Sequence, residues 1–245
     1  MALAGGPSMP DEIPALLASH IRAEASSRGL RLAAVSGTYN MAHPDASARA
    51  DGQRRLHELI AAAAGLGTGV VTLCTGSRDA TDMWRRHPDN GTPEAWRDML
   101  ASVEAALTAA EAHEVILAFE PEHNNVVHSA AAGRRLLDEV RSPRLKVIID
   151  PANLLDRGGL DRQGDTLREA FQLLGGDLVL AHAKDLRADG TIAAAGRGGL
   201  DYELYLALLG HAGHDVPLIL HALAEDEVTD SVAFLRSTLA RTRSG

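Results

Sequence analysis

The sequence predicts an α/β fold in which parallel strands are covered by helices, and three observations support this. Short apolar segments alternate with helical segments along the whole chain of 245 residues. These apolar segments are nearly continuous runs of Val, Ile, Leu and Ala, as is typical of strands buried on both faces. Aromatic residues make up only 3% of the chain, so aliphatic side chains must form most of the core.

Length and composition limit the organisation and the function. The length fits one α/β barrel or two small domains, and because no linker or low-complexity tract divides the chain, we expect a single domain over residues 1–245. The net charge of −9 opposes nucleic-acid binding, which needs a basic surface. The lone cysteine, Cys74, excludes an internal disulfide. No apolar stretch reaches the ~20 residues of a membrane span, and no signal peptide is evident, so we expect a cytoplasmic protein without a membrane partner.

The first half of the chain predicts three helices and two strands. A helical stretch begins near Pro10 and Asp11 and ends at Ser27 to Gly29. The other predicted elements are a strand over 32–36, a helix over 48–64, a strand over 70–73 and a helix over 92–112. A long loop, residues 75–91, precedes the last of these helices.

The second half contains four apolar strands that each end in a residue able to bind a metal. The strands are 115–119, 145–149, 178–181 and 218–220, and the residues that follow them are Glu120, Asp150, His182 and His221. Helices are predicted near 130–140, 164–174 and 201–211 between these strands, and a last helix near 228–241. The spacing therefore places one polar strand end in each strand–helix unit.

These four strand ends predict a shared site. In a closed parallel barrel the carboxyl ends of the strands carry the active site, so two carboxylates and two imidazoles would meet around one divalent cation. A single polar residue at a strand end is more often a turn former or a helix cap, and Asp150 before Pro151 could simply begin a turn. Four such residues in successive units favour the shared site over four unrelated caps.

Three segments of this half resemble one known family. They are Phe119-Glu120-Pro121, Ile149-Asp150 with Asn153, and His182-Ala183-Lys184-Asp185-Leu186-Arg187. In order and spacing they resemble the xylose isomerase-like TIM-barrel family of sugar isomerases, epimerases and inosose dehydratases, from about Pro7 to the C-terminus. The resemblance implies metal ligands on barrel strands five to eight, which correspond here to Glu120, Asp150, His182 and His221. The family has a glutamate at the strand-eight position, so His221 is a departure that puts the second catalytic carboxylate in doubt.

The resemblance also implies that the barrel is incomplete. The six strands visible in the sequence would be strands three to eight of a TIM (β/α)8-type barrel, with strands 1 and 2 missing at the N-terminus. A chain that starts late and a naturally open barrel both fit this count. In either case the strands near 33–35 and 218–220 should be open edges.

We expect the function to be that of a metal-dependent sugar or sugar-phosphate isomerase or epimerase. It would remove a proton next to a carbonyl and pass through an enediolate, with Glu120 as base and His221 as a second acid or base. Carboxylate ligands favour Mn²⁺ or Mg²⁺, and the two histidines are also compatible with Zn²⁺ or Co²⁺. His43, Asn153, Lys184 and Arg187 are candidate substrate-binding residues, although a solvated loop charge is the alternative for Lys184 and Arg187. The expected partner is a small-molecule sugar or sugar phosphate, and a homo-oligomer is compatible with the sequence.

Three other functions are considered. The same scaffold supports an inosose-type dehydratase, and the pattern around His182 fits that lyase equally well. A truncated, inactive member would have the fold without the activity. A DNA-repair endonuclease, also found in this fold family, is opposed by the acidic charge and by the absence of a multi-metal ligand set.

Overall fold

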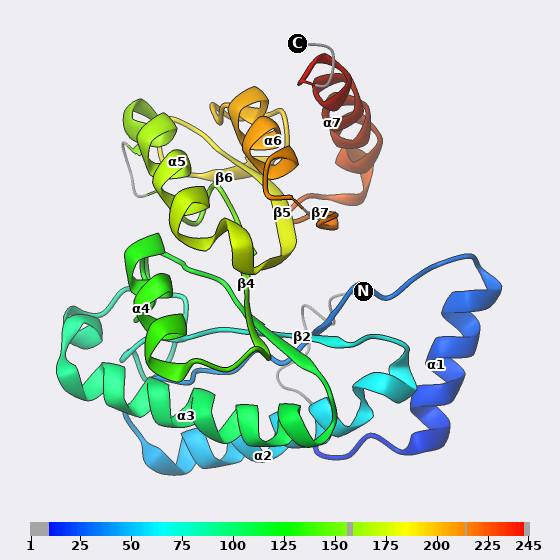
Figure 1. Cartoon of the computed structure of the whole chain (residues 1–245), viewed down its shortest axis with the longest axis vertical. Helices are drawn as coiled ribbons and strands as arrows, with labels where there is room; N and C mark the ends of the chain where they lie inside the picture. The colour runs from blue at the N-terminus through cyan, green and yellow to red at the C-terminus, as the bar shows by residue number, and fades with distance from the viewer. Residues whose placement is uncertain (1–9, 156–158, 214, 243–245) are drawn as a thin grey trace. The chain divides into compact units, whose positions relative to one another are not determined.

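The computed structural model describes residues 10–155, 159–213 and 215–242 (Figure 1). The chain divides into two compact units. The first unit consists of Met1–Glu120, Asn124–Val127 and Leu136–Lys146, and the second of Pro121–His123, His128–Arg135 and Val147–Gly245. The single domain expected from the sequence stays a prediction.

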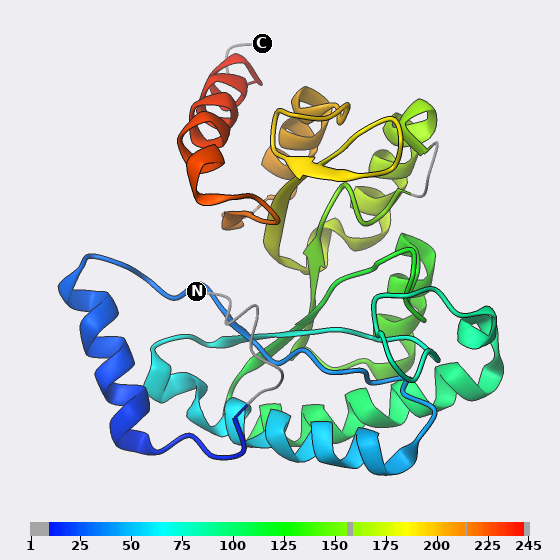
Figure 2. The ribbon, with the colours of Figure 1, turned by 180° about the vertical axis from the view of Figure 1, so that it is seen from behind.

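The first unit contains three parallel strands in the order β1 (Val35–Ser36), β2 (Val70–Leu73) and β3 (Ile116–Phe119). Val71 pairs with Val35 on one side and with Leu117 on the other. The long helices are α1 (Ala15–Ser27), α2 (Ala46–Leu66) and α3 (Pro93–Ala112), and a short 3-10 helix, η1 (Pro88–Gly91), precedes α3. Helices α2 and α3 lie side by side, as both views show (Figures 1 and 2).

Local sequence signals set the ends of α2 and α3. The Asp45 side chain accepts a hydrogen bond from the amide of Ser47, and Thr92 does the same for Ala95 at the start of α3. Proline at the first position of α3 suits a site where no backbone donor is needed. Gly67 ends α2 in the left-handed conformation, with φ at 90°. These caps explain why both helices lie within two residues of their predicted bounds.

Helix α1 departs from its prediction. It begins at Ala15, because Pro14 stands at the N-cap and the residues before it are not helical. Its apolar side chains are largely exposed: Leu16 by 74% and Leu17 by 50%. The strand expected over 32–36 is also shorter, with only Val35 and Ser36 in β1.

The second unit contains parallel and antiparallel strand pairs. Strand β4 (Leu145–Ile149) leads into it from the first unit and pairs in parallel with β5 (Leu178–Leu186) through its last three residues. Strand β7 (Leu218–Leu220) also pairs in parallel with β5. Strand β6 (Ile192–Ala194) pairs with the end of β5 in the antiparallel direction, and Figure 2 shows this hairpin.

The remaining helices follow the predicted alternation. They are α4 (Ala130–Val140), whose residues are divided between the two units, α5 (Gln163–Leu174), α6 (Tyr202–Gly210) and α7 (Val228–Thr242). Short 3-10 helices are η2 (Gly159–Arg162), η3 (Gly175–Asp177) and η4 (Glu225–Glu227). Within the second unit α6 contacts both α5 and α7.

The α/β class and the incomplete barrel are confirmed. Among the described residues six strands, β1 to β5 and β7, take part in parallel pairing, which is the number predicted and two fewer than a closed (β/α)8 barrel has. The sequence did not predict β6, and β5 was expected to end at His182. Helices in the described ranges are all too short or too polar to cross a bilayer.

Candidate metal centre

Strand register brings three predicted ligands to the same end of the parallel strands in the second unit. Ile149 of β4 pairs with Ala181 of β5, so Asp150 and His182 follow at the same level. His182 pairs with Ile219 of β7, and His221 lies two residues beyond it. Because side chains alternate between the faces of a sheet, all three point to the same face. The backbone amide of His221 donates to the carbonyl of Ala183, which holds His221 against β5.

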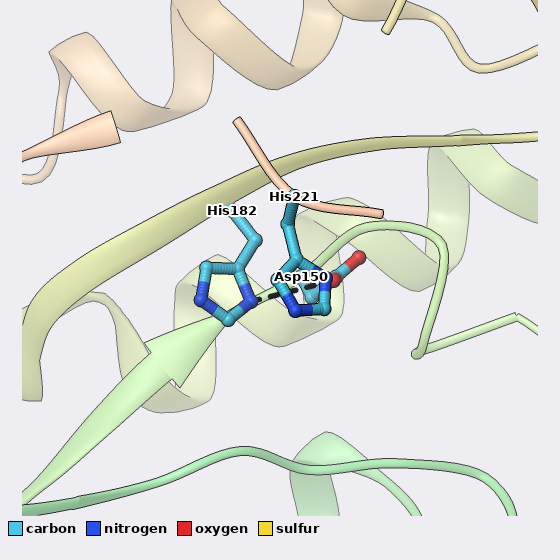
Figure 3. A group of neighbouring side chains, drawn as sticks. All are labelled: Asp150, His182 and His221. Carbon is cyan, nitrogen blue, oxygen red and sulfur yellow. Dashed lines mark ion pairs between the residues drawn. The ribbon is translucent and has the colours of Figure 1, made fainter. Parts of the chain in front are cut away.

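The three side chains form a compact cluster (Figure 3). One potential ligand atom from each of Asp150, His182 and His221 lies within 4.8 Å of the others. The His182 Nδ1 lies 3.5 Å from the Asp150 Oδ2, and the two imidazoles stack face to face with centroids 4.7 Å apart. Asp150 is fully buried, His182 is partly buried and His221 is exposed, so the cluster extends from the core toward solvent.

The two carboxylate oxygens of Asp150 have different partners. Oδ1 accepts hydrogen bonds from the amides of Ala152 and Asn153, which is the turn geometry that Asp before Pro predicts. Oδ2 faces His182 and the ammonium of Lys184. Burial alone would raise the pKa of Asp150, but the nearby His182 and the charge of Lys184 lower it below its usual range. The turn hypothesis and the ligand hypothesis are therefore compatible, because Oδ1 makes the turn and Oδ2 is left for an ion.

Lys184 is a buried member of the same cluster. Its Nζ lies 3.1 Å from the Asp150 Oδ2 and donates a hydrogen bond to the Asn153 Oδ1. Only 5% of the residue is exposed, so the alternative of a solvated loop charge is wrong for Lys184. That alternative assumed a loop after His182, whereas β5 continues to Leu186 and directs Lys184 to the same face as His182. A contact between Lys184 and substrate stays a prediction.

Two tyrosines of α6 hold the strands beneath the cluster, and sequence analysis missed them. The Tyr205 hydroxyl lies within hydrogen-bond distance of the carbonyls of His182, at 3.0 Å, and Ile149, at 3.3 Å. The Tyr202 hydroxyl donates to the carbonyl of Lys184. Burial raises the pKa of Tyr202, so its hydroxyl keeps the proton that it donates. Their spacing of three residues on a helix was the available signal.

Asp185 is a third residue to which the sequence analysis gave no role, although it lies in one of the segments that resemble the family. Its carboxylate is 1% exposed and accepts hydrogen bonds from the amides of Leu186, Gly196 and Leu200. A Cβ atom on Gly198 would come within 2.3 Å of the Asp185 Oδ1. The segment that contains Gly196, Gly198 and Gly199 is therefore fixed to β5 by Asp185.

Glu120 belongs to the first unit. It directly follows β3, as Asp150 follows β4, and it is half-buried. Its predicted position beside the other three ligands, and its role as base, stay predictions.

The other predicted substrate-binding residues have varied surroundings. His43, in the first unit, accepts a hydrogen bond from the amide of Asp45 at Nδ1, and its Nε2 lies 3.1 Å from the carbonyl of Ala80. This geometry favours a role in fixing its loop. Asn153 contacts Lys184, whereas Arg187 is exposed and donates to the carbonyl of Ile192 in the β5–β6 hairpin. Substrate contact by each of them stays a prediction.

The donor set of the cluster fits a divalent cation. One carboxylate oxygen and two imidazole nitrogens are ligands that Mn²⁺, Zn²⁺ and Co²⁺ accept, at about 2.0–2.2 Å for zinc. Atoms within 4.8 Å of one another need to move little to reach such distances around one centre. Asp150, His182 and His221 would hold the ion, with His221 on the solvent side.

Comparison with known proteins shows which structures share this fold. A search of curated proteins found no match. The structure is similar to a xylose isomerase domain protein from Planctomyces limnophilus, with 18% identity and a TM-score of 0.75 over 96% of this chain and 86% of that one. It is similar to a D-tagatose 3-epimerase-like protein, with 13% identity and a TM-score of 0.77 over 94% and 84%. It also resembles the IolI protein with a bound zinc atom, with 12% identity and a TM-score of 0.70 over 92% and 81%.

These structural similarities concern the fold, and a sequence model identifies the family. The model of the xylose isomerase-like TIM barrel matches residues 5–238, which is nearly the whole chain. The matched range includes most of both units, the three-residue cluster and Glu120. The chain therefore belongs to the xylose isomerase-like TIM barrel family.

Proposed function

We propose that this protein is a metal-dependent sugar or sugar-phosphate isomerase or epimerase that removes a proton next to a carbonyl and passes through an enediolate. The observation that carries the proposal is the cluster of Asp150, His182 and His221 at the carboxyl ends of parallel strands. Active sites of (β/α)8 barrels lie at these ends. Family membership and a fold shared with an epimerase-like protein support sugar as the substrate class.

Each residue of the site has a separate role in the proposed reaction. A bound divalent ion would polarise the substrate carbonyl and so make the neighbouring proton more acidic. Glu120 removes this proton, because it is a carboxylate that directly follows β3, as Asp150 directly follows β4. His221, the exposed member of the cluster, returns a proton in place of the glutamate that the family has on strand eight. Asp150 and His182 hold the ion.

Proton exchange with solvent tests this function directly. The protein is incubated with Mn²⁺ and a panel of ketohexoses that includes D-tagatose, in deuterated buffer, and deuterium at the carbon next to the carbonyl is measured by NMR. We expect incorporation that stops after treatment with a chelator and resumes when Mn²⁺ is restored. The Asp150→Asn variant should lose both the exchange and the metal.

A parallel incubation with an inosose separates the lyase alternative. An epimeric ketose with exchanged deuterium supports the proposal, whereas an ultraviolet-absorbing enone from the inosose alone would assign the dehydratase activity instead. Metal binding at Asp150 without turnover of any compound in either panel would contradict the isomerase proposal and favour an inactive member.

A further inference from the structure

We propose that Lys184 sets the metal affinity of this site by competing with the ion for the Asp150 Oδ2. This inference rests on the proposed metal site and goes beyond it, because it gives Lys184 a positioning role that is independent of substrate. The ammonium lies 3.1 Å from the oxygen that would bind the ion. A metal about 2.1 Å from the same oxygen would therefore lie within about 5 Å of a positive charge.

The position of Lys184 is fixed by the fold. It lies two residues after His182 on β5, so both side chains point to the same face. Its Nζ bonds to the Asn153 Oδ1, and its carbonyl accepts a hydrogen bond from Tyr202. With only 5% of the residue exposed, the ammonium has little room to move into solvent. The positive charge therefore stays beside the ligand set.

Lysine is a rare residue in this chain, and position 184 is one of the few places where it occurs. The chain has 24 lysine and arginine residues, and only Lys146 and Lys184 are lysines. An ammonium is a compact point charge that fits between Asp150 and Asn153, whereas a planar guanidinium with five donors needs more partners. Lysine is therefore better suited than arginine to place one buried positive charge beside one carboxylate oxygen.

Two effects of Lys184 on metal binding oppose each other, and repulsion is the larger. Removal of Lys184 would remove one contact that orients Asp150, but the amides of Ala152 and Asn153 still hold Oδ1. Removal also eliminates the repulsion between a single and a double positive charge about 5 Å apart, which is several times the thermal energy inside a protein. We therefore expect neutral variants to bind metal at least about tenfold more tightly.

The test measures Mn²⁺ and Zn²⁺ affinity by isothermal titration calorimetry on the full chain after chelator treatment. The neutral variants are Lys184→Met and Lys184→Gln, the latter keeping a donor for Asn153 in case the former does not fold. Lys184→Arg keeps the charge. Lys146→Met is the matched control, since it removes the only other lysine charge, from the opposite end of β4. Thermal unfolding of each metal-free variant is recorded in parallel.

We expect tighter binding for both neutral variants, affinity close to that of the unsubstituted protein for Lys184→Arg, and no change for Lys146→Met. The metal-free neutral variants should unfold at lower temperature, because the buried Asp150 loses its cation. Equal or weaker binding by a folded neutral variant, while Asp150→Asn abolishes binding, would overturn the role of Lys184 and leave the metal site intact. Failure of both the unsubstituted protein and the neutral variants to bind either ion would overturn the metal site as well.

Discussion

The two carboxylate oxygens of Asp150 have different surroundings. Its Oδ1 caps the turn that follows β4, while its Oδ2 faces His182 and Lys184. The sequence could predict the position of this carboxylate at a strand end and could also predict a turn. It could not predict that each oxygen has its own partners, because that depends on the register of β4 against β5.

The first prediction at this scale concerns Glu120. Glu120→Gln should reduce proton exchange at least about 100-fold, because an amide does not accept a proton at neutral pH. Metal should still bind, with reduced affinity, because an amide oxygen is a weak ligand. Deuterium incorporation and calorimetric metal titration measure the two effects. Glu114→Gln, an exposed position before β3, is the control. Unchanged exchange in Glu120→Gln would remove Glu120 from the role of base.

A second residue-scale prediction uses Asp79 in the long loop after β2. Hydrogen bonds from Thr81 and Asp82, and the charge of Arg85, lower the pKa of Asp79 to about 2. A lowered pKa in the folded state means that the stabilising contribution is present above the unfolded pKa of about 3.8 and is lost as the pH falls toward 2. Carboxyl carbon NMR across this range should show the late titration. Asp79→Asn should remove this acid sensitivity, and a midpoint near 3.8 for Asp79 would contradict the loop geometry.

Among the elements, most helices and strands agree with the sequence, whereas the first helix, the first strand and the β5–β6 hairpin differ from it. Thr92 with Pro93, and Gly67, are strong local signals, so α3 and the end of α2 agree with the sequence. The extension of β5 and the β6 hairpin were missed because their signal is not local. Asp185 fixes them through the amides of Gly196 and Leu200, which are far along the chain.

Helix α6 gives a prediction for an element that supports the site. Tyr205→Phe should cost about 1 kcal/mol of unfolding free energy through the lost hydrogen bonds to β4 and β5. It should also weaken metal binding several-fold, since those bonds fix the backbone at His182. Tyr39→Phe is a matched control, because Tyr39 is partly buried and also makes a hydrogen bond through its hydroxyl, with Gln53, but lies in the first unit. Urea unfolding and metal titration of both variants separate the effects, and equal metal affinity in both would exclude a positioning role for Tyr205.

The hairpin after β5 allows a test of the glycine at its base. Gly198→Ala should destabilise the second unit by about 1–3 kcal/mol, because its Cβ would overlap the buried carboxylate of Asp185. Gly176→Ala is the control, since nothing lies within 4 Å of a Cβ there. Thermal unfolding monitored by circular dichroism compares the two, and equal melting temperatures would show that Asp185 does not hold this segment.

At the scale of the whole molecule, periodicity predicted the α/β class, and the strand count together with the family resemblance predicted the incomplete barrel. The four strand-end residues were also visible in the sequence, and three of them form one cluster. The exposed face of α1 was not predictable, because helical periodicity indicates an apolar face and does not show whether anything covers it. Lys184 was misjudged for a similar reason, since burial depends on neighbours from other elements.

The measurement that tests the central claim most directly is a crystal structure with Mn²⁺, with the ion located by its anomalous scattering. We expect one strong peak about 2.0–2.3 Å from an oxygen of Asp150 and a nitrogen of each of His182 and His221, with Glu120 as the fourth protein ligand. An anomalous peak elsewhere on the chain, or no peak at these residues in crystals grown with excess Mn²⁺, would contradict the account.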